Sequence, residues 1–370
     1  MMISSMEDST THRNRYLKQL STGTLIAVVA LLITTVASVL TIGVYLNNKY
    51  VAFQSASGLS KQQLLELTEE SLVTRQQPLT QPLTILILGL DTLETRPGSP
   101  KLTDTMLLAQ IDFETATITT LPLPRDLWSP EYQTRINALY HYGTEQEREQ
   151  PETFPAEVLA DMTGLTFDYT IVIEMDRLSE LIDLVGGVTV DIPEAFTDDQ
   201  FPRSDVDVTK EADPAKLYKT VSFAAGEQLL TGESALEYIR SRKSAGTEGT
   251  DLARSRRQQQ VILALFEKIT NPAILLNPTT AGSLVSFYLH HFDSYMPLSM
   301  VGKIGVSLLP KLDAIAFQNE QLPVSPESEH GVIYHPPTWQ HAGQWIYLAE
   351  DHQTFKAYFQ TIFNSDHAQN

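Results

Sequence analysis

An uncharged apolar segment near the N-terminus constrains this chain more than any other feature. No Asp, Glu, Lys or Arg occurs from Ser21 to Asn48, and the stretch TLIAVVALLITTVASVLTIGVYL within that range has 23 residues. An apolar helix of this length crosses a bilayer core of about 30 Å. We therefore expect residues 22–46 to form an uncleaved transmembrane signal-anchor helix. The alternative is a cleaved signal peptide, whose apolar core is shorter, about 7–15 residues, and ends at a small-residue site.

Charges on either side of this segment predict its orientation. Arg13, Arg15 and Lys18 precede it, whereas Lys49 alone follows it closely. The positive-inside rule then places residues 1–21 in the cytoplasm and the rest of the chain beyond the membrane. We expect a single-pass protein of the cell membrane with an extracytoplasmic domain, which must work without the cytosolic nucleotide pool.

Composition excludes several classes of function. The chain has 370 residues, of which 42% are hydrophobic and 19% charged, as in ordinary globular proteins. Its net charge of -19 argues against a nucleic-acid partner, because that kind of binding depends on many Lys and Arg residues that neutralise phosphates. The absence of cysteine excludes disulfides, thiolate metal sites and cysteine nucleophiles.

The pattern after the apolar segment predicts a short stalk and then one domain. Residues 47–81 are polar with a weak helical period, so they form either a stalk or a peripheral first helix of the domain. Residues 82–365 alternate short apolar runs, typical of buried strands, with amphipathic helical patterns. This alternation favours an α/β fold, an α/β/α sandwich with a mixed central sheet. The expected strands are LTILILGLD, DTMLLAQID, TATITTLPL, DYTIVIEM and VTVDI, and residues 197–219 are expected to form a polar surface loop.

A cluster of six Lys and Arg residues lies late in the chain, in the segment YIRSRKSAGTEGTDLARSRRQQQ at residues 238–260. The chain as a whole is acidic, so the cluster is a local feature. We predict one helix that begins after an N-cap at Thr231 and a second helix that is N-capped by Asp251. The glycines between the two helices indicate a loop that could move over a site.

Helical spacing predicts the direction of each arginine in the second helix. Arg254, Arg257 and Gln258 share a row that continues into the apolar face, so their side chains should point toward the core. Arg256 falls on a different row. Arg256 and Lys243 are therefore better interpreted as solvated surface charges.

Arg240 and Arg242 stand two residues apart where the first helix should end, so an extended exit would direct both to one side. Guanidinium groups that point inward are costly unless they are paired, and their planar fork suits phosphate. A pyrophosphate would satisfy several of them at once. The alternative is a set of structural ion pairs with acids such as Asp251 and Glu237.

Two acidic residues follow or begin early strands of the predicted sheet. Asp91 comes directly after LILGL and Asp104 lies in LTDTM, at the edge where an open α/β sheet presents its ligands. Mg²⁺ is commonly held by one or two carboxylates together with a substrate phosphate. The alternative for each residue is a local cap or bend. Arg125 in LPLPRDLW would add a fifth arginine to the same edge.

Seven motifs occur in the order and spacing of one known family. They are LGLDT, LTDTMLL, LPRD, RINALYHYG, GGVTVDI, LTGESALEYIRSR and DLARSRRQQQVI. In these motifs the chain resembles the LytR-CpsA-Psr family from about Pro82 to Phe363. The resemblance implies an α/β/α sandwich with a mixed sheet and a deep apolar tunnel for a prenyl chain. The chain departs from the family pattern at Thr103, where the family often has Ser, and in the acidic loop 197–219.

The resemblance also implies roles for individual residues. It implies that Asp91 and Asp104 bind magnesium and that Asp251 orients neighbouring groups. The residues that it implies for pyrophosphate binding are Arg125, Arg240, Arg242, Arg254, Arg257 and Gln258. The residues that it implies for catalysis are Asp91, Asp104, Arg125, Arg254 and Arg257.

The implied function is that of a Mg²⁺-dependent phosphotransferase of the cell envelope. Family members move a glycopolymer from a polyprenyl-pyrophosphate carrier to the peptidoglycan of the cell wall. A hydroxyl of the acceptor would attack the phosphorus bonded to the glycan, and polyprenyl phosphate would leave. Two alternatives stay open, namely a non-catalytic envelope regulator that binds polyprenyl phosphate, and a hydrolase of the same pyrophosphate bond.

Overall fold

The computed structural model describes residues 44–90, 100–146, 148–203, 206, 211, 213–326, 328 and 330–363. The expected cytoplasmic tail and most of the expected membrane helix therefore lie outside the described residues. A helix covers residues 44–57. Within the described ranges, no helix combines the length and the apolar character that a membrane crossing requires.

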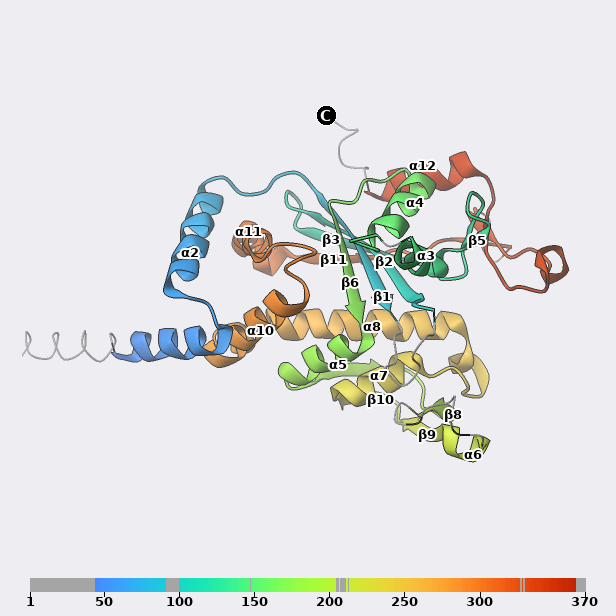
Figure 1. The fold of residues 1–370 in the computed structure, drawn as a ribbon, viewed down its shortest axis with the longest axis horizontal. Coiled ribbons are helices and arrows are strands. Elements are labelled where there is room, and N and C mark those ends of the chain that lie inside the picture. The colour runs from blue at the N-terminus through green and yellow to red at the C-terminus, as the bar shows by residue number, and fades with distance from the viewer. Residues whose placement is uncertain are drawn as a thin grey trace, which may run out of the picture.

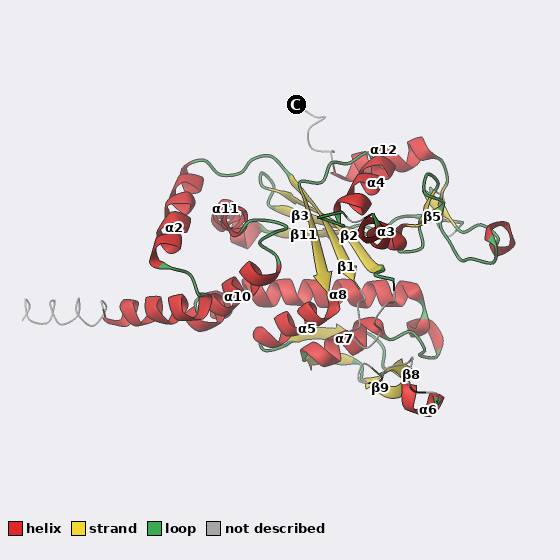
Figure 2. Ribbon diagram, viewed as in Figure 1, coloured by secondary structure: helices red, strands yellow, loops and turns green. Residues whose placement is uncertain are grey.

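A five-stranded mixed sheet forms the centre of the fold (Figures 1 and 2). Strand β1 runs parallel to β6 and antiparallel to β2, β2 runs antiparallel to β3, and β11 runs parallel to β3. The prediction of a mixed central sheet with flanking helices is thus confirmed. In spatial order the strands are β11 (Ala316–Asn319), β3 (Thr117–Leu123), β2 (Thr103–Asp112), β1 (Leu83–Leu90) and β6 (Tyr169–Glu174).

The apolar sequence of β1 explains why helices lie against both faces of this sheet. Because side chains alternate along a strand, Leu86 and Leu88 face one core, whereas Leu83 and Ile85 face another. The first core is completed by α3, α4 and α12, which gather on one side of the sheet in Figure 1. The second core is completed by α11. These helices are α3 (Leu139–Glu145), α4 (Thr153–Thr163), α11 (Leu298–Leu308) and α12 (His352–Phe363).

A further hydrophobic core lies beyond the end of the sheet, among helices and short strands. Its buried residues include Ile182, Val190, Ala235 and Val261. The predicted strand VTVDI is confirmed as a strand, but it pairs with β10 in a separate two-stranded sheet. The elements of this layer are α5 (Met175–Leu184), β7 (Val188–Ile192), β8 (Phe196–Pro202), β9 (Tyr218–Phe223), β10 (Gly226–Leu230), α7 (Gly232–Arg240) and α8 (Asp251–Thr270).

The acidic segment 197–219 differs from the expected surface loop. Its first and last parts pair as the antiparallel strands β8 and β9. Phe201 and Asp198 on β8 are buried. Apolar and polar residues alternate too irregularly here for the strand period to be visible in the sequence, so the prediction of a loop is wrong at both ends.

The N-terminal residues of the described chain pack against the domain. Helix α2 (Lys61–Gln76) contacts α11, and the backbone N–H of Leu79 donates to the Ser307 hydroxyl at 2.9 Å. This packing agrees with the alternative of a peripheral first helix. The boundary between a stalk at 47–81 and a domain at 82–365 stays a prediction.

The two helices around the basic cluster begin close to where the sequence predicts. Thr231 caps α7, and its hydroxyl accepts from the N–H of Ser234. Helix α8 begins at Asp251, but its N-cap is Thr250, whose hydroxyl accepts from the N–H of Ala253 at 3.1 Å. The predicted cap at Asp251 is therefore wrong by one residue. Both side chains suit a cap, and the extended backbone at Thr250 decides between them.

The remaining elements connect these layers. Their bounds are β4 (Trp128–Ser129), β5 (Thr134–Arg135), α6 (Pro214–Leu217), α9 (Pro272–Leu275), α10 (Pro278–His291), β12 (Val324–Ser325), β13 (Ile333–Tyr334) and β14 (Leu348–Ala349), with 3₁₀ turns at Ile136–Ala138, Gly246–Gly249, Leu309–Ala314 and Thr338–His341.

Candidate active site

Asp104 lies at the edge of the sheet where three neighbouring strands bring polar residues together. The start of β2 pairs with the end of β1 through Thr103 and Leu90, and with the end of β3 through Met106 and Leu123. The residues that follow β3 are therefore neighbours of the first residues of β2. This register places the segment after β3, which carries Arg125, beside Asp104.

Two guanidinium groups converge on the Asp104 carboxylate. Arg125 Nη1 donates to one oxygen at 2.9 Å, and Arg242 Nη2 donates to the other at 2.8 Å. Arg242 follows α7, and α7 lies in a different layer of the fold from β3, the strand that precedes Arg125 (Figure 1). The side chain of Asp104 is 12% exposed. Both carboxylate oxygens are thus paired with positive charge.

Arg254 adds a third positive charge beside this carboxylate. It lies in the first turns of α8 and is buried, as the row of inward-facing residues predicts. Burial acts to raise the pKa of Asp104, but the charges of Arg125, Arg242 and Arg254 outweigh it and hold the pKa below its ordinary value of 3.8. Asp104 is consequently ionised at neutral pH.

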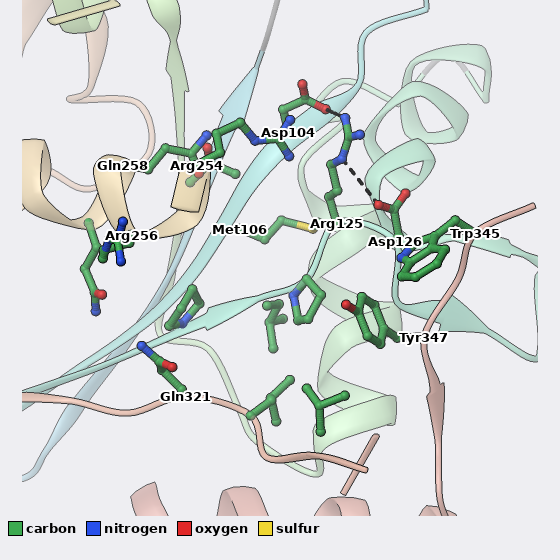
Figure 3. A pocket seen from close by; sticks show the side chains of 17 residues that line it. Asp104, Met106, Arg125, Asp126, Arg254, Arg256, Gln258, Gln321, Trp345 and Tyr347 are labelled. Atoms are coloured by element: carbon green, nitrogen blue, oxygen red, sulfur yellow. Dashed lines mark hydrogen bonds and ion pairs between the residues drawn. The ribbon is translucent and has the colours of Figure 1, made fainter. Parts of the chain in front are cut away.

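Asp126 holds the guanidinium of Arg125 from the other side (Figure 3). Its carboxylate lies 3.4 Å from Arg125 Nε and 2.9 Å from Arg135 Nη1. Asp126 is buried and stands next to Arg125 in the LPRD motif, yet the sequence analysis did not select it. Its position in the motif was the signal that could have found it. The pairing fixes the direction in which Arg125 faces Asp104.

Two pockets meet at the same three residues, Asp104, Arg254 and Gln258. The larger, here called the Trp345 pocket, has a volume of about 350 Å³. Its polar lining residues include Arg125, Asp126 and Arg256, and its apolar lining residues include Leu322, Val324, Trp345 and Tyr347. The smaller, here called the Phe201 pocket, has a volume of about 240 Å³ and is lined by Asp198, Phe201, Arg240, Arg242 and Lys243.

Arg242 and Lys243 are held at the Phe201 pocket by a buried acid. Asp198 on β8 is 1% exposed, and one of its oxygens accepts from the backbone N–H of Arg242 at 2.8 Å and of Lys243 at 3.0 Å. The Arg240 guanidinium lies 5.9 Å from the centre of the Phe201 ring. The segment 197–219 therefore positions the exit of α7. No motif in the sequence indicated this contact.

Arg257 lies apart from these groups and lines neither pocket. It is fully buried, and its guanidinium donates to the carbonyl oxygens of Tyr238, Ser241 and Glu248 and to the Glu248 carboxylate at 2.8 Å. Burial lowers the pKa of Arg257, and the hydrogen bond to Glu248 opposes that shift. This geometry matches the alternative of a structural ion pair, in which Arg257 holds the loop between α7 and α8. The implied contact of Arg257 with a pyrophosphate stays a prediction.

The structure describes some of the remaining predicted residues and leaves others undescribed. Asp91 lies outside the described residues. Asp251 is the first residue of α8, but its side chain lies outside what the structure describes. Arg256 and Lys243 are exposed as predicted, yet each lines a pocket. Arg256 also forms an ion pair with Glu248, so it is not an isolated surface charge.

The donor atoms at this site fit a magnesium ion that is shared with a phosphate. Among the described residues, no group of three or more His, Cys, Asp or Glu side chains could hold a metal ion. Mg²⁺ needs only one or two carboxylates when a substrate phosphate completes its coordination. Asp104 supplies one such ionised oxygen ligand.

Comparisons with known proteins agree with the motifs. A family model described as the LytR_cpsA_psr family matches residues 43–341. The chain is 28% identical over 197 residues to TagV of Bacillus subtilis, named a polyisoprenyl-teichoic acid–peptidoglycan teichoic acid transferase, with 52% of this chain and 44% of that protein covered. It is 29% identical over 206 residues to biofilm regulatory protein A of Streptococcus mutans, with 51% and 44% covered.

These alignments span about half the length of the curated relatives. Among solved structures, the crystal structure of B. subtilis TagV superposes with a TM-score of 0.54 and 19% sequence identity, over 77% of this chain and 98% of that chain. At this level of identity the likeness concerns the fold.

Proposed function

Because the chain belongs to the LytR-CpsA-Psr family, whose model covers residues 43–341, we propose that it is a glycopolymer phosphotransferase of the cell envelope. The donor is a glycan on a polyprenyl-pyrophosphate carrier, and the acceptor is peptidoglycan or another envelope polymer. The observation that carries the proposal is the convergence of Arg125 and Arg242 on Asp104, with Arg254 beside them. The transferase name of the relative TagV supports the same reaction class.

The arginines supply the binding energy for the donor's pyrophosphate. Three positive charges surround one carboxylate, so the site retains an excess of positive charge after Asp104 is counted. Guanidinium groups bind phosphate oxygens bidentately. Arg125 is held by Asp126, and Arg242 is held through its backbone by Asp198. The site is thus arranged before the donor binds, which favours electrostatic catalysis.

The proposed reaction is an in-line displacement at phosphorus. A hydroxyl oxygen of the acceptor forms a bond to the phosphorus that carries the glycan, and the bond from that phosphorus to the bridging oxygen breaks. Polyprenyl phosphate leaves with the bonding electrons, and the hydroxyl proton passes to a base. Positioning and charge neutralisation carry most of such a reaction. Asp104 is a weak base because its pKa is lowered, so its role is to fix charges rather than to remove the proton.

Magnesium is part of the proposal because Asp104 offers an ionised ligand next to the arginines. When bound, Mg²⁺ would neutralise charge on the phosphates. Asp104, with Asp91 as the second implied carboxylate, would hold it. The energy of the donor's pyrophosphate makes a nucleotide unnecessary, which agrees with the proposed extracytoplasmic location behind a membrane anchor at residues 22–46.

A transfer assay tests this function against both alternatives. The full chain in detergent, with Mg²⁺, is given a prenyl-pyrophosphate-linked disaccharide labelled in the sugar, together with peptidoglycan. Transfer moves the label into peptidoglycan and releases prenyl phosphate. Label that appears only as soluble sugar phosphate indicates a hydrolase, and label that stays on the carrier indicates a binding protein. When the assay is repeated with variants of the site arginines, the matched control is Arg177→Ala. It removes an exposed arginine that is paired with Glu180 on α5.

A further inference from the structure

An exposed tryptophan forms part of the wall of the larger pocket. Trp345 is 53% exposed and lines the Trp345 pocket beside Arg125, Asp126 and Tyr347 (Figure 3). A large apolar side chain that stays exposed at the wall of a pocket is a common feature of binding sites. Trp345 also lies after residue 341, where the match to the family model ends. It is therefore a feature of this chain beyond the matched family region.

The indole ring is held in place by its neighbours. It stacks on the ring of His335, with 3.4 Å between ring centroids and an interplanar angle of 26°. A ring nitrogen of His335 lies 2.8 Å from the carbonyl oxygen of Ile346. The N–H of Tyr347 donates to the Asp126 carbonyl at 2.9 Å, which ties the segment to the site. A ring fixed in this way loses little freedom when a ligand binds, so it is preorganised for contact.

The groups around this ring combine an aromatic surface with hydrogen-bonding side chains. Asp126, Arg125, Gln259 and Gln321 all line the pocket. A prenyl chain needs apolar walls throughout, and a phosphate alone has no use for an aromatic face. A pyranose ring matches both features, because its C–H face packs on an aromatic ring while its hydroxyl groups bond to carboxylates and amides.

We infer that Trp345, with His335 and Tyr347, forms a subsite for a pyranose ring next to the phosphate site. This inference rests on the proposed function and names the part of its substrate that the pocket recognises. Arg125 lines the same pocket as Trp345 and contacts Asp104, so a sugar on Trp345 would share the pocket with one of the arginines proposed to bind phosphate. The sugar belongs either to the donor glycan or to the acceptor glycan. Both have the same ring chemistry.

Binding measurements with three probes test the inference without turnover. The probes are citronellyl pyrophosphate linked to a disaccharide, citronellyl pyrophosphate without sugar, and a soluble peptidoglycan glycan fragment. Trp345→Ala should weaken binding of one sugar-bearing probe about tenfold, or ~1.4 kcal/mol, and leave the sugar-free probe unchanged. Loss with the linked disaccharide indicates the donor glycan, and loss with the glycan fragment indicates the acceptor.

Two further variants keep the result interpretable. Trp345→Phe retains an aromatic face and should restore most of the affinity. Trp339→Ala removes another exposed tryptophan, 79% exposed, that lines neither pocket, and should change nothing. Unchanged binding of both sugar-bearing probes by Trp345→Ala overturns the inference. Equal loss with all three probes also overturns it, because the ring would then contact lipid or phosphate or support the fold.

The outcome is separable from that of the transfer assay. Sugar-selective loss in Trp345→Ala without any transfer by the parent chain supports the subsite and contradicts the transferase. Normal transfer with no effect of Trp345→Ala on binding supports the transferase and overturns the subsite.

Discussion

Arg242 donates a hydrogen bond of 2.8 Å to Asp104 although 138 positions of sequence separate them. Arg125 donates to the same carboxylate from only 21 positions away. Arg125 comes shortly after β3 of the central sheet, whereas Arg242 comes shortly after α7, in the layer of helices and short strands beyond that sheet. The two layers of the fold therefore meet at a single acid, which makes that acid the most informative position to change.

Replacing Asp104 should change stability in a way that depends on pH. Because the pKa of Asp104 is lowered in the folded state, its ionised carboxylate stabilises the protein above its ordinary pKa of 3.8, and this contribution is lost as pH falls through the lower folded value. Asp104→Asn should cost about 3 kcal/mol at pH 7, since it removes the largely buried carboxylate that balances Arg242 and, together with Asp126, Arg125. Urea unfolding at pH 7 and at pH 3 measures the effect. An equal cost at both pH values would contradict the role of the charge.

The planar fork of Arg125 should matter beyond its charge. Arg125 contacts Asp104 with Nη1 and faces Asp126 with Nε, and a lysine has no pair of donors in that geometry. Arg125→Lys should lower kcat/KM for transfer roughly 100-fold, the usual size of a lost preorganised donor. The control Arg177→Lys at an exposed ion pair should leave transfer unchanged. Full activity in Arg125→Lys would show that only the positive charge at this position matters for transfer.

The buried acid on β8 should act on the site through Arg242. Asp198→Ala leaves the N–H groups of Arg242 and Lys243 without their acceptor, so the Arg242 guanidinium should shift away from Asp104. We expect roughly a tenfold rise in the KM for the lipid-linked donor, and a smaller rise for Asp198→Asn, which keeps one acceptor oxygen. Asp199→Asn at the exposed neighbouring position is the control. Identical donor KM values in all three variants would exclude the positioning role.

Arg257 and Arg256 contact the same acid but should differ in their contribution to stability. Arg257 is fully buried, whereas the Arg256 side chain is 49% exposed. Arg257→Met removes the charge that balances buried Glu248 and should cost about 3–5 kcal/mol in the free energy of unfolding. Arg256→Ala should cost about 1 kcal/mol or less. Chemical denaturation compares the two, and the double variant Arg257→Met with Glu248→Gln should recover part of the loss.

Removal of divalent cations should lower transfer if Asp104 holds magnesium together with the donor. EDTA should reduce transfer by the parent chain, and added Mg²⁺ should restore it. The residual activity of Asp104→Asn should respond to Mg²⁺ only at a higher concentration. Equal transfer activity of the parent chain with and without EDTA would contradict a role for magnesium.

Local patterns were sufficient for β1, β2 and the helices α7 and α8 near the site, but not for β8 and β9. The strands at Leu83–Leu90 and Thr103–Asp112 follow from apolar runs, and the inward direction of Arg254 and Arg257 follows from helical spacing. These features depend on a few consecutive residues, because the side-chain pattern of a strand or helix repeats every two to four residues. The cap of α8 shows the limit, since Thr250 and Asp251 are both good caps in sequence.

By itself the sequence predicted that five arginines need anions, and that acids such as Asp104 stand at strand ends. The five are Arg125, Arg240, Arg242, Arg254 and Arg257. Only the tertiary structure decided which anion each arginine meets. It paired Arg257 with Glu248, paired Arg242 with Asp104 through Asp198, and placed Trp345 beside Arg125. The physical reason is that an ion pair depends on the distance between atoms of different layers, and that distance is set by how sheet and helices pack rather than by spacing along the chain.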